Sequence, residues 1–73
     1  MDQIKKRIAI LGSTGSIGTQ ALDVIAQHPD VFEVEVLTAQ NNADLLIAQA
    51  KQHKPNAVVI ANEKLYQQVK EEL

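Results

Sequence analysis

Apolar residues occur along the chain in two alternating arrangements. Short apolar runs occupy residues 8–11, Phe32–Ala39 and Ala57–Ile60, and a stretch with apolar residues three or four positions apart follows each run. The runs predict strands of a parallel sheet. The first run is continuously apolar, which is typical of a strand that is covered on both faces of the sheet. The second strand is expected to begin half-exposed, because Val34 and Val36 alternate with glutamates.

The intervening stretches predict helices over residues 16–28, over Ala43–His53 and from Asn62 onward, where Asn62 acts as the cap. Pro29 ends the first helix, since proline disfavours helical geometry in the residue before it. The side chains expected to face the core are those of Ile17, Ala21, Leu22, Ile25, Leu46, Ile47, Ala50, Leu65, Tyr66, Val69 and Leu73.

The resulting order of elements predicts an α/β fold. Strands that alternate with helices of this length form right-handed parallel crossovers. The pattern therefore indicates a Rossmann-type doubly wound parallel sheet, represented by its first β-α-β-α-β-α half only. Three strands leave the sheet incompletely covered, so residues 1–73 are interpreted as the N-terminal part of a larger dinucleotide-binding domain.

Three glycines join the first predicted strand to the first predicted helix, within residues 12–18. Gly12 is expected to turn the chain through a positive φ, and Gly18 to let the helix pack closely on the sheet. Gly15 lacks a Cβ, so a cofactor pyrophosphate could approach the main chain there.

The start of this helix is the expected phosphate site. The N–H groups of Gly15, Ser16 and Ile17 would point at the phosphates, aided by the helix dipole and by the hydroxyls of Thr14 and Ser16. The alternative is an ordinary glycine turn before a serine-capped helix. A P-loop is excluded because no lysine follows Gly18.

The end of the second strand bears on the choice of cofactor. NAD enzymes usually place a carboxylate there to bind the ribose 2′-hydroxyl, whereas this chain has Ala39, Gln40, Asn41 and Asn42. Neutral amides tolerate a 2′-phosphate, so NADPH is favoured. Asn41 or Asn42 is also expected to cap the next helix, with Asn41 and Asp44 forming a capping box.

Composition narrows the function classes. The net charge is −2 and the only aromatic rings outside histidine are Phe32 and Tyr66, which argues against nucleic-acid binding. No apolar stretch is long enough for a signal peptide or a membrane span, so a cytoplasmic location is expected. His28 and His53 lie near predicted helix ends, where structural roles are the more common.

The loop and the helix after it resemble a known family. Gly12-Ser13-Thr14-Gly15-Ser16-Ile17-Gly18 followed by Leu22-Asp23-Val24 is similar to the opening segment of the 1-deoxy-D-xylulose 5-phosphate reductoisomerase family. The resemblance implies that Gly12, Thr14, Gly15, Ser16 and Ile17 contact NADPH, and that Asn41 and Asn42 lie near the adenosine ribose phosphate. Many members have Gly-Lys or Gly-Ser where this chain has Gln40-Asn41. Where a lysine would pair with the 2′-phosphate, Asn41 can supply only a neutral hydrogen bond, so the resemblance implies either a weaker affinity or preference for NADPH, or a compensating basic residue outside this segment.

The resemblance further implies an oxidoreductase that rearranges a sugar phosphate with Mg²⁺ or Mn²⁺ and reduces the product with NADPH, for isoprenoid synthesis. It implies a homodimer as the full-length protein. The catalytic and metal-binding residues would lie beyond Leu73, so this chain alone should be inactive. The alternatives are another NADP-dependent dehydrogenase, of the semialdehyde dehydrogenase type, or a non-catalytic α/β module, either one that binds a nucleotide or a structural one whose loop binds nothing.

Overall fold

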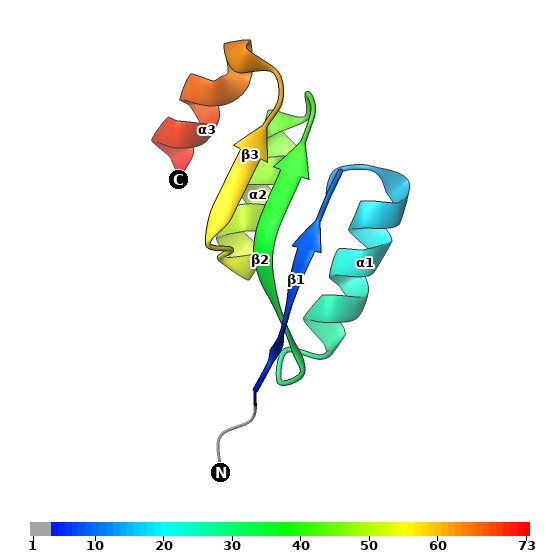
Figure 1. Ribbon diagram of the computed structural model, residues 1–73. Helices are drawn as coiled ribbons and strands as arrows, with labels where there is room; N and C mark the ends of the chain where they lie inside the picture. Colours follow the sequence, from blue (N-terminus) through cyan, green and yellow to red (C-terminus); the bar gives the residue numbers. More distant parts are fainter. Residues whose placement is uncertain (1–3) are drawn as a thin grey trace.

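The computed structural model describes residues 4–73, and it shows three strands with helices after each (Figure 1). The predicted domain spans residues 1–73, and its first three residues lie outside the described part. The elements are β1 (Lys6–Ile10), α1 (Ser16–Gln27), β2 (Phe32–Ala39), α2 (Ala43–His53), β3 (Ala57–Ile60), the 3-10 helix η1 (Glu63–Leu65) and α3 (Tyr66–Glu72). The predicted bounds of β2, α2 and β3 are confirmed.

Three boundaries differ from the predictions. β1 begins at Lys6 and ends at Ile10, because Gly12 turns the chain soon afterwards with a φ of +73°. α1 ends at Gln27, and the N–H of His28 donates to the carbonyl of Ile25. The last helix begins as the 3-10 turn η1, whose cap is Asn62 as expected.

The three strands form one parallel sheet in the order β1-β2-β3. Consecutive parallel strands lie side by side, and each crossover contains a helix, as the pattern of apolar residues predicted. The α/β fold class and its assignment to the first half of a Rossmann-type sheet are therefore confirmed.

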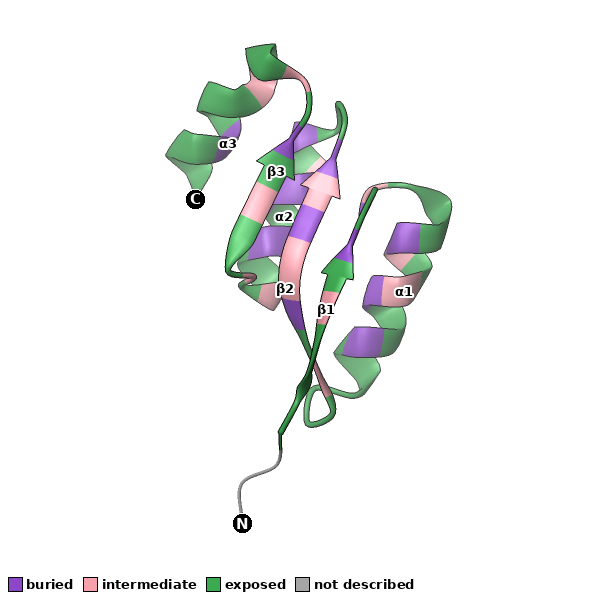
Figure 2. Cartoon of the chain, viewed as in Figure 1, coloured by how far each residue is buried: buried purple, intermediate pink, exposed green. Residues whose placement is uncertain are grey.

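The core lies on one face of the sheet. Buried side chains of α1, α2 and α3 join those of the strands in a single cluster, which Figure 2 shows along the inner sides of the helices. Across the sheet, Ile10 is paired with Leu37 and Leu37 with Val58, and this row faces the core.

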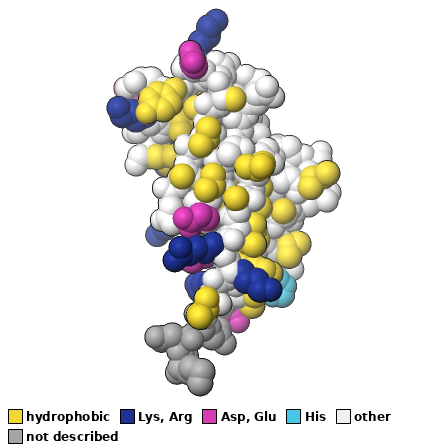
Figure 3. Space-filling model, viewed as in Figure 1, with side chains coloured by type: hydrophobic (Ala, Val, Ile, Leu, Met, Phe, Trp, Pro, Cys, Tyr) yellow, Lys and Arg dark blue, Asp and Glu magenta, His cyan; other side chains and the backbone are white. Residues whose placement is uncertain are grey.

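The opposite face of the sheet is open. Its row of Ala9, Val36 and Ala57 is exposed or half-buried, and hydrophobic side chains gather over the strands on the face seen in Figure 3. The expectation that the first strand is covered on both faces is therefore wrong for this chain. Residues 4–73 supply helices for one face only.

An irregularity in β2 changes which of its side chains are buried. The register between β1 and β2 shifts between Ile8 and Ala9, so that Ile8 is opposite Val34 but Ala9 is opposite Val36. Val34 is buried, whereas Val36 is half-buried on the open face and Leu37 takes the inner position. Simple alternation of Val34 and Val36 therefore fails after Glu35, because one extra residue shifts the later side chains to the other face.

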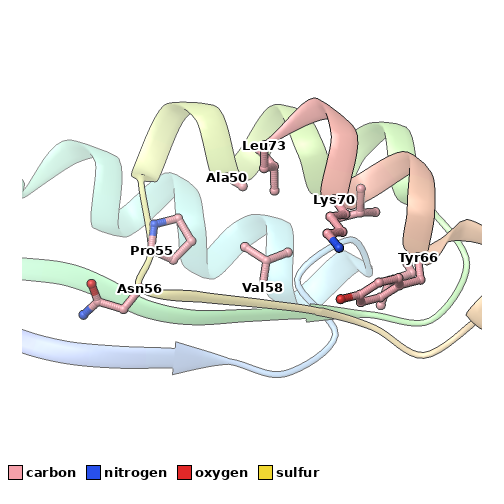
Figure 4. A pocket seen from close by; sticks show the side chains of 9 residues that line it. Ala50, Pro55, Asn56, Val58, Tyr66, Lys70 and Leu73 are labelled. Atoms are coloured by element: carbon pink, nitrogen blue, oxygen red, sulfur yellow. The ribbon is translucent and has the colours of Figure 1, made fainter.

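The face predicted for the last helix is only partly covered. Val69 is buried and Leu65 packs against the core, but Tyr66 and Leu73 are mostly exposed. These two line an open groove with Val58 of β3, which Figure 4 shows between the strand and α3.

Candidate functional site

The glycine-rich turn between β1 and α1 is held by β2 at its start. The N–H of Gly12 donates to Thr38 Oγ1 at 2.9 Å, and the N–H of Ser13 donates to the Thr38 carbonyl at 2.8 Å. The positive φ expected for Gly12 is confirmed. This part of the turn therefore has a fixed position relative to the carboxyl end of β2.

Gly18 lies where α1 approaches the turn most closely. A Cβ at this position would lie 2.3 Å from the Gly12 carbonyl oxygen and 2.7 Å from Ser13 Cα. Both atoms belong to the backbone, so no side chain could rotate out of the way. The expected role of Gly18 in close packing is confirmed.

Gly15 is different, because neither packing nor backbone geometry requires a glycine there. Its φ of −81° and ψ of 174° suit any residue, and a Cβ would meet only the Gly12 carbonyl oxygen at an ordinary 3.5 Å. One expectation is wrong. The N–H of Gly15 is not free, since it donates to the Gly12 carbonyl at 3.1 Å and closes the turn.

The start of α1 has unused hydrogen-bond donors. Within residues 4–73, the N–H groups of Ser16, Ile17 and Gly18 have no protein acceptor, and the hydroxyls of Thr14 and Ser16 make no hydrogen bond. The N-cap is Gly15, without any side-chain cap or first-turn acid. The alternative of a serine-capped helix is therefore wrong.

At the starts of α2 and η1 the chain itself supplies a side-chain cap and a carboxylate, and α3 continues directly from η1. Asn42 caps α2 and Asp44 lies in its first turn, while Asn62 caps η1 and Glu63 lies in its first turn. Among the helices of the described residues that follow a strand or loop, only α1 begins without a side-chain cap and without a carboxylate in its first turn. An anion at α1 would receive the N–H groups and the positive end of the helix dipole.

Two surface hollows meet at Gly12, and neither of them is lined by Thr14, Asn41 or Asn42. One is lined by Gly12, Gly15, Ser16 and Ile17, with neighbouring residues of β1 and α1. The other joins Gly12 to Thr38, Gln40 and the start of the loop after β3. Ile17 was expected on the side of the helix that faces the core, but its side chain is 84% exposed and lines the first hollow.

The asparagines after β2 differ in what they bind. Asn42 is the cap of α2, with its Oδ1 accepting the N–H of Leu45 at 3.2 Å. The predicted capping box of Asn41 and Asp44 is wrong, since Asn41 Oδ1 accepts from Asn62 Nδ2 at 3.0 Å and Asp44 accepts from Gln68. Both asparagines are exposed at the carboxyl edge of the sheet.

Gln49 supports the turn from α2, and the sequence reasoning missed it. Its Nε2 donates to the Ser13 carbonyl at 2.8 Å, and both residues are buried, Ser13 completely. Two buried atoms, Ser13 Oγ and Gln49 Oε1, have no hydrogen-bond partner. The available signal was a polar residue one turn after Leu46, on the apolar side of the helix. Thr38 gave a similar signal as the one hydroxyl in β2.

Other site types have little support in the described part of the chain. Residues 4–73 contain no group of three or more metal-ligating side chains placed to hold an ion. None of the helices formed by these residues is long and apolar enough to cross a bilayer. His53 is near the C-terminal end of α2, and partial burial lowers its pKa below the usual 6.5.

Comparison with known proteins identifies close relatives. The chain is 66% identical over its whole length to 1-deoxy-D-xylulose 5-phosphate reductoisomerase of Bacteroides fragilis, and it spans 19% of that protein. It is 66% identical over 96% of its length to the enzyme of Phocaeicola vulgatus. The structure of the Zymomonas mobilis enzyme in complex with NADPH matches 96% of the chain, with a TM-score of 0.92 and 38% identity.

The chain spans about a fifth of the length of these relatives. The family model for 1-deoxy-D-xylulose 5-phosphate reductoisomerase matches residues 8–73, which include the whole glycine-rich turn and both asparagines after β2. This chain belongs to the 1-deoxy-D-xylulose 5-phosphate reductoisomerase family.

Proposed function

We propose that residues 1–73 are the N-terminal part of an NADPH-binding domain, and that the turn before α1 holds the cofactor pyrophosphate. The observation that carries this proposal is the uncapped start of α1, where the N–H groups of Ser16, Ile17 and Gly18 have no protein acceptor. The site fits a diphosphate because its donors follow a turn with no side chain at Gly15.

The remaining cofactor contacts follow from the positions of the side chains. Thr14 and Ser16 supply free hydroxyls to the phosphates, and the exposed apolar surface of Ile17 packs against the adjoining ribose. Gly12 gives the turn its shape, and Gly15 allows close approach. Asn41 and Asn42 lie at the carboxyl edge of the sheet, where the adenosine ribose binds in this fold.

The whole protein's activity is proposed from family membership. The full-length enzyme would rearrange and reduce 1-deoxy-D-xylulose 5-phosphate to 2-C-methyl-D-erythritol 4-phosphate, with Mg²⁺ or Mn²⁺ bound by residues outside this chain. NADPH supplies the hydride when bound, while this chain's residues bind and orient it. A cytoplasmic homodimer is proposed on the resemblance alone. The open face of the sheet would be covered by the rest of the longer protein.

The family match gives no support to the alternative of a semialdehyde dehydrogenase. The structural form of the other alternative, a non-catalytic module whose loop binds nothing, makes a distinct prediction. Calorimetric titration of the full-length protein with NADPH and NADH separates the two cases, because the module would give no heat with either cofactor.

The placement of the pyrophosphate is tested by Gly15→Val. The branched side chain would stand over the N–H groups that begin α1, so NADPH binding is expected to be lost. The φ and ψ of Gly15 are extended and suit valine, so the unliganded protein should still fold. An unchanged dissociation constant for NADPH in this variant would place the pyrophosphate elsewhere.

A further inference from the structure

Three asparagines lie at the carboxyl edge of the sheet, and two of them, Asn41 and Asn62, are hydrogen-bonded to each other. Asn41 and Asn42 follow β2, and Asn62 follows β3 on the adjacent strand. An asparagine amide has an oxygen that accepts and a nitrogen that donates. Whether each amide presents its oxygen or its nitrogen to a ligand therefore depends on which of the two the protein already uses.

The orientation of Asn62 is determined by the backbone. Its Oδ1 accepts the N–H of Lys64 at 3.0 Å, and a backbone N–H can only donate, so the partner must be the amide oxygen. The nitrogen of Asn62 therefore points the other way. It donates to Asn41 Oδ1 at 3.0 Å.

This contact determines what Asn41 offers to a ligand. Because its oxygen is already paired with Asn62, its Nδ2 is left without an acceptor among residues 4–73. Asn42 is in the same situation, since its Oδ1 accepts the N–H of Leu45 and its Nδ2 is unused. The two exposed amides therefore present N–H donors and have their oxygens engaged.

The charges around the pair agree with this description. Residues 39–43 contain no carboxylate. The acid that follows them, Asp44, is held by Gln68 of α3 at 2.7 Å, and the acid that follows Asn62, Glu63, lies in the first turn of η1. A ribose 2′-hydroxyl is best held by an acceptor such as a carboxylate, whereas a 2′-phosphate accepts hydrogen bonds only. The two amide donors, in a segment without a carboxylate, match the phosphate.

We propose that Asn62 is a positioning residue that sets cofactor specificity, by holding Asn41 with its nitrogen outward so that Asn41 and Asn42 present only donors to the 2′-phosphate of NADPH. Selection of NADPH over NADH then needs no basic side chain at position 41. This inference rests on the proposed cofactor function and adds to it the residue that orients the specificity contact.

The test compares NADPH and NADH dissociation constants in the full-length protein and its Asn62 variants by calorimetry. Asn62→Ser keeps a hydroxyl that can cap η1 but removes the donor to Asn41. Asn62→Asp keeps the cap and replaces the donor with an acceptor, so that Asn41 turns its nitrogen inward. Both variants should keep the unfolding temperature of the unliganded protein within a few degrees.

The expected result is a change in the ratio of the two constants. Asn62→Ser should weaken NADPH binding about fivefold, and Asn62→Asp about tenfold or more, while NADH binding changes less than about twofold. Asn41→Asp, which places an acceptor at the contact itself, should lose the NADPH preference in the same way.

Other outcomes separate this inference from the cofactor proposal. A wild-type protein that binds neither cofactor contradicts the proposed function. A wild-type protein that prefers NADPH, with Asn62 variants that keep the preference or lose affinity for both cofactors equally, leaves the function standing and overturns the role of Asn62. Equal wild-type affinity for NADPH and NADH overturns it as well.

Discussion

Replacing Gly18 with alanine tests how closely α1 packs on the glycine-rich turn. The added Cβ would lie 2.3 Å from the Gly12 carbonyl oxygen, 2.7 Å from Ser13 Cα and 2.9 Å from the Ser13 carbonyl carbon. These atoms cannot rotate away, because Thr38 holds both residues of the turn at 2.8–2.9 Å. The helix must therefore move away from the turn.

The size of the effect follows from two opposing contributions. Overpacking of a well-packed site costs about 1–3 kcal/mol, and three backbone contacts under 3.0 Å place this case at the upper end. Alanine recovers about 1 kcal/mol of helix propensity relative to glycine. The net loss in the free energy of unfolding is expected to be about 2 kcal/mol, a large fraction of the stability of a small domain.

Gly15→Ala is the matched control, three residues away on the same turn. Its Cβ would meet one atom at 3.5 Å, and the backbone conformation already suits alanine. Thermal unfolding of the full-length protein without cofactor, followed by circular dichroism, should therefore show a lower midpoint for Gly18→Ala and an unchanged or higher one for Gly15→Ala. Equal midpoints for the two variants would refute the assignment of close packing to Gly18.

Two further predictions concern residues outside the turn. Gln49→Leu should lower the free energy of unfolding by about 1–3 kcal/mol in urea titrations, because the buried Ser13 carbonyl loses its donor; a stabilised variant would contradict this. Burial lowers the pKa of His53 in the folded state, so the unfolded chain binds protons more readily and stability should fall as the pH drops below 6.5. His53→Gln should show a smaller loss between pH 7.5 and 5.5 in melts at each pH, and identical pH profiles would show that His53 contributes nothing.

The order of elements was predictable because each depends on neighbours in the chain. Alternation of apolar runs with helical spacing is a local property, and Pro29 marks the end of α1 without any tertiary contact. The positive φ of Gly12 and the close backbone contact at Gly18 were predictable for the same reason, since a strand that passes directly into a helix needs a tight turn. The residues expected to bind the cofactor remain predictions.

Several errors occurred where contacts between distant segments decide the outcome. Val36 lies on the open face because an extra residue interrupts the pairing of β1 with β2, which no pattern within β2 alone reveals. Ile17 has the spacing of a core residue, yet its side chain is exposed at the first turn of α1. One error was local: the Gly15 N–H is used inside the turn, where it donates to the Gly12 carbonyl three residues earlier and closes the bend.

The sequence by itself determined the α/β order, the turn chemistry and the lack of a carboxylate after the second strand, since these depend on residue type and local spacing. Only the tertiary structure decided which donors remain free. Parallel pairing of β2 and β3 brings Asn62 beside Asn41, 21 positions apart, and the packing of α2 brings Gln49 beside Ser13, 36 positions apart. A hydrogen bond between segments so distant in the chain depends on how the strands and helices pack, and that packing sets which polar groups are left for a ligand.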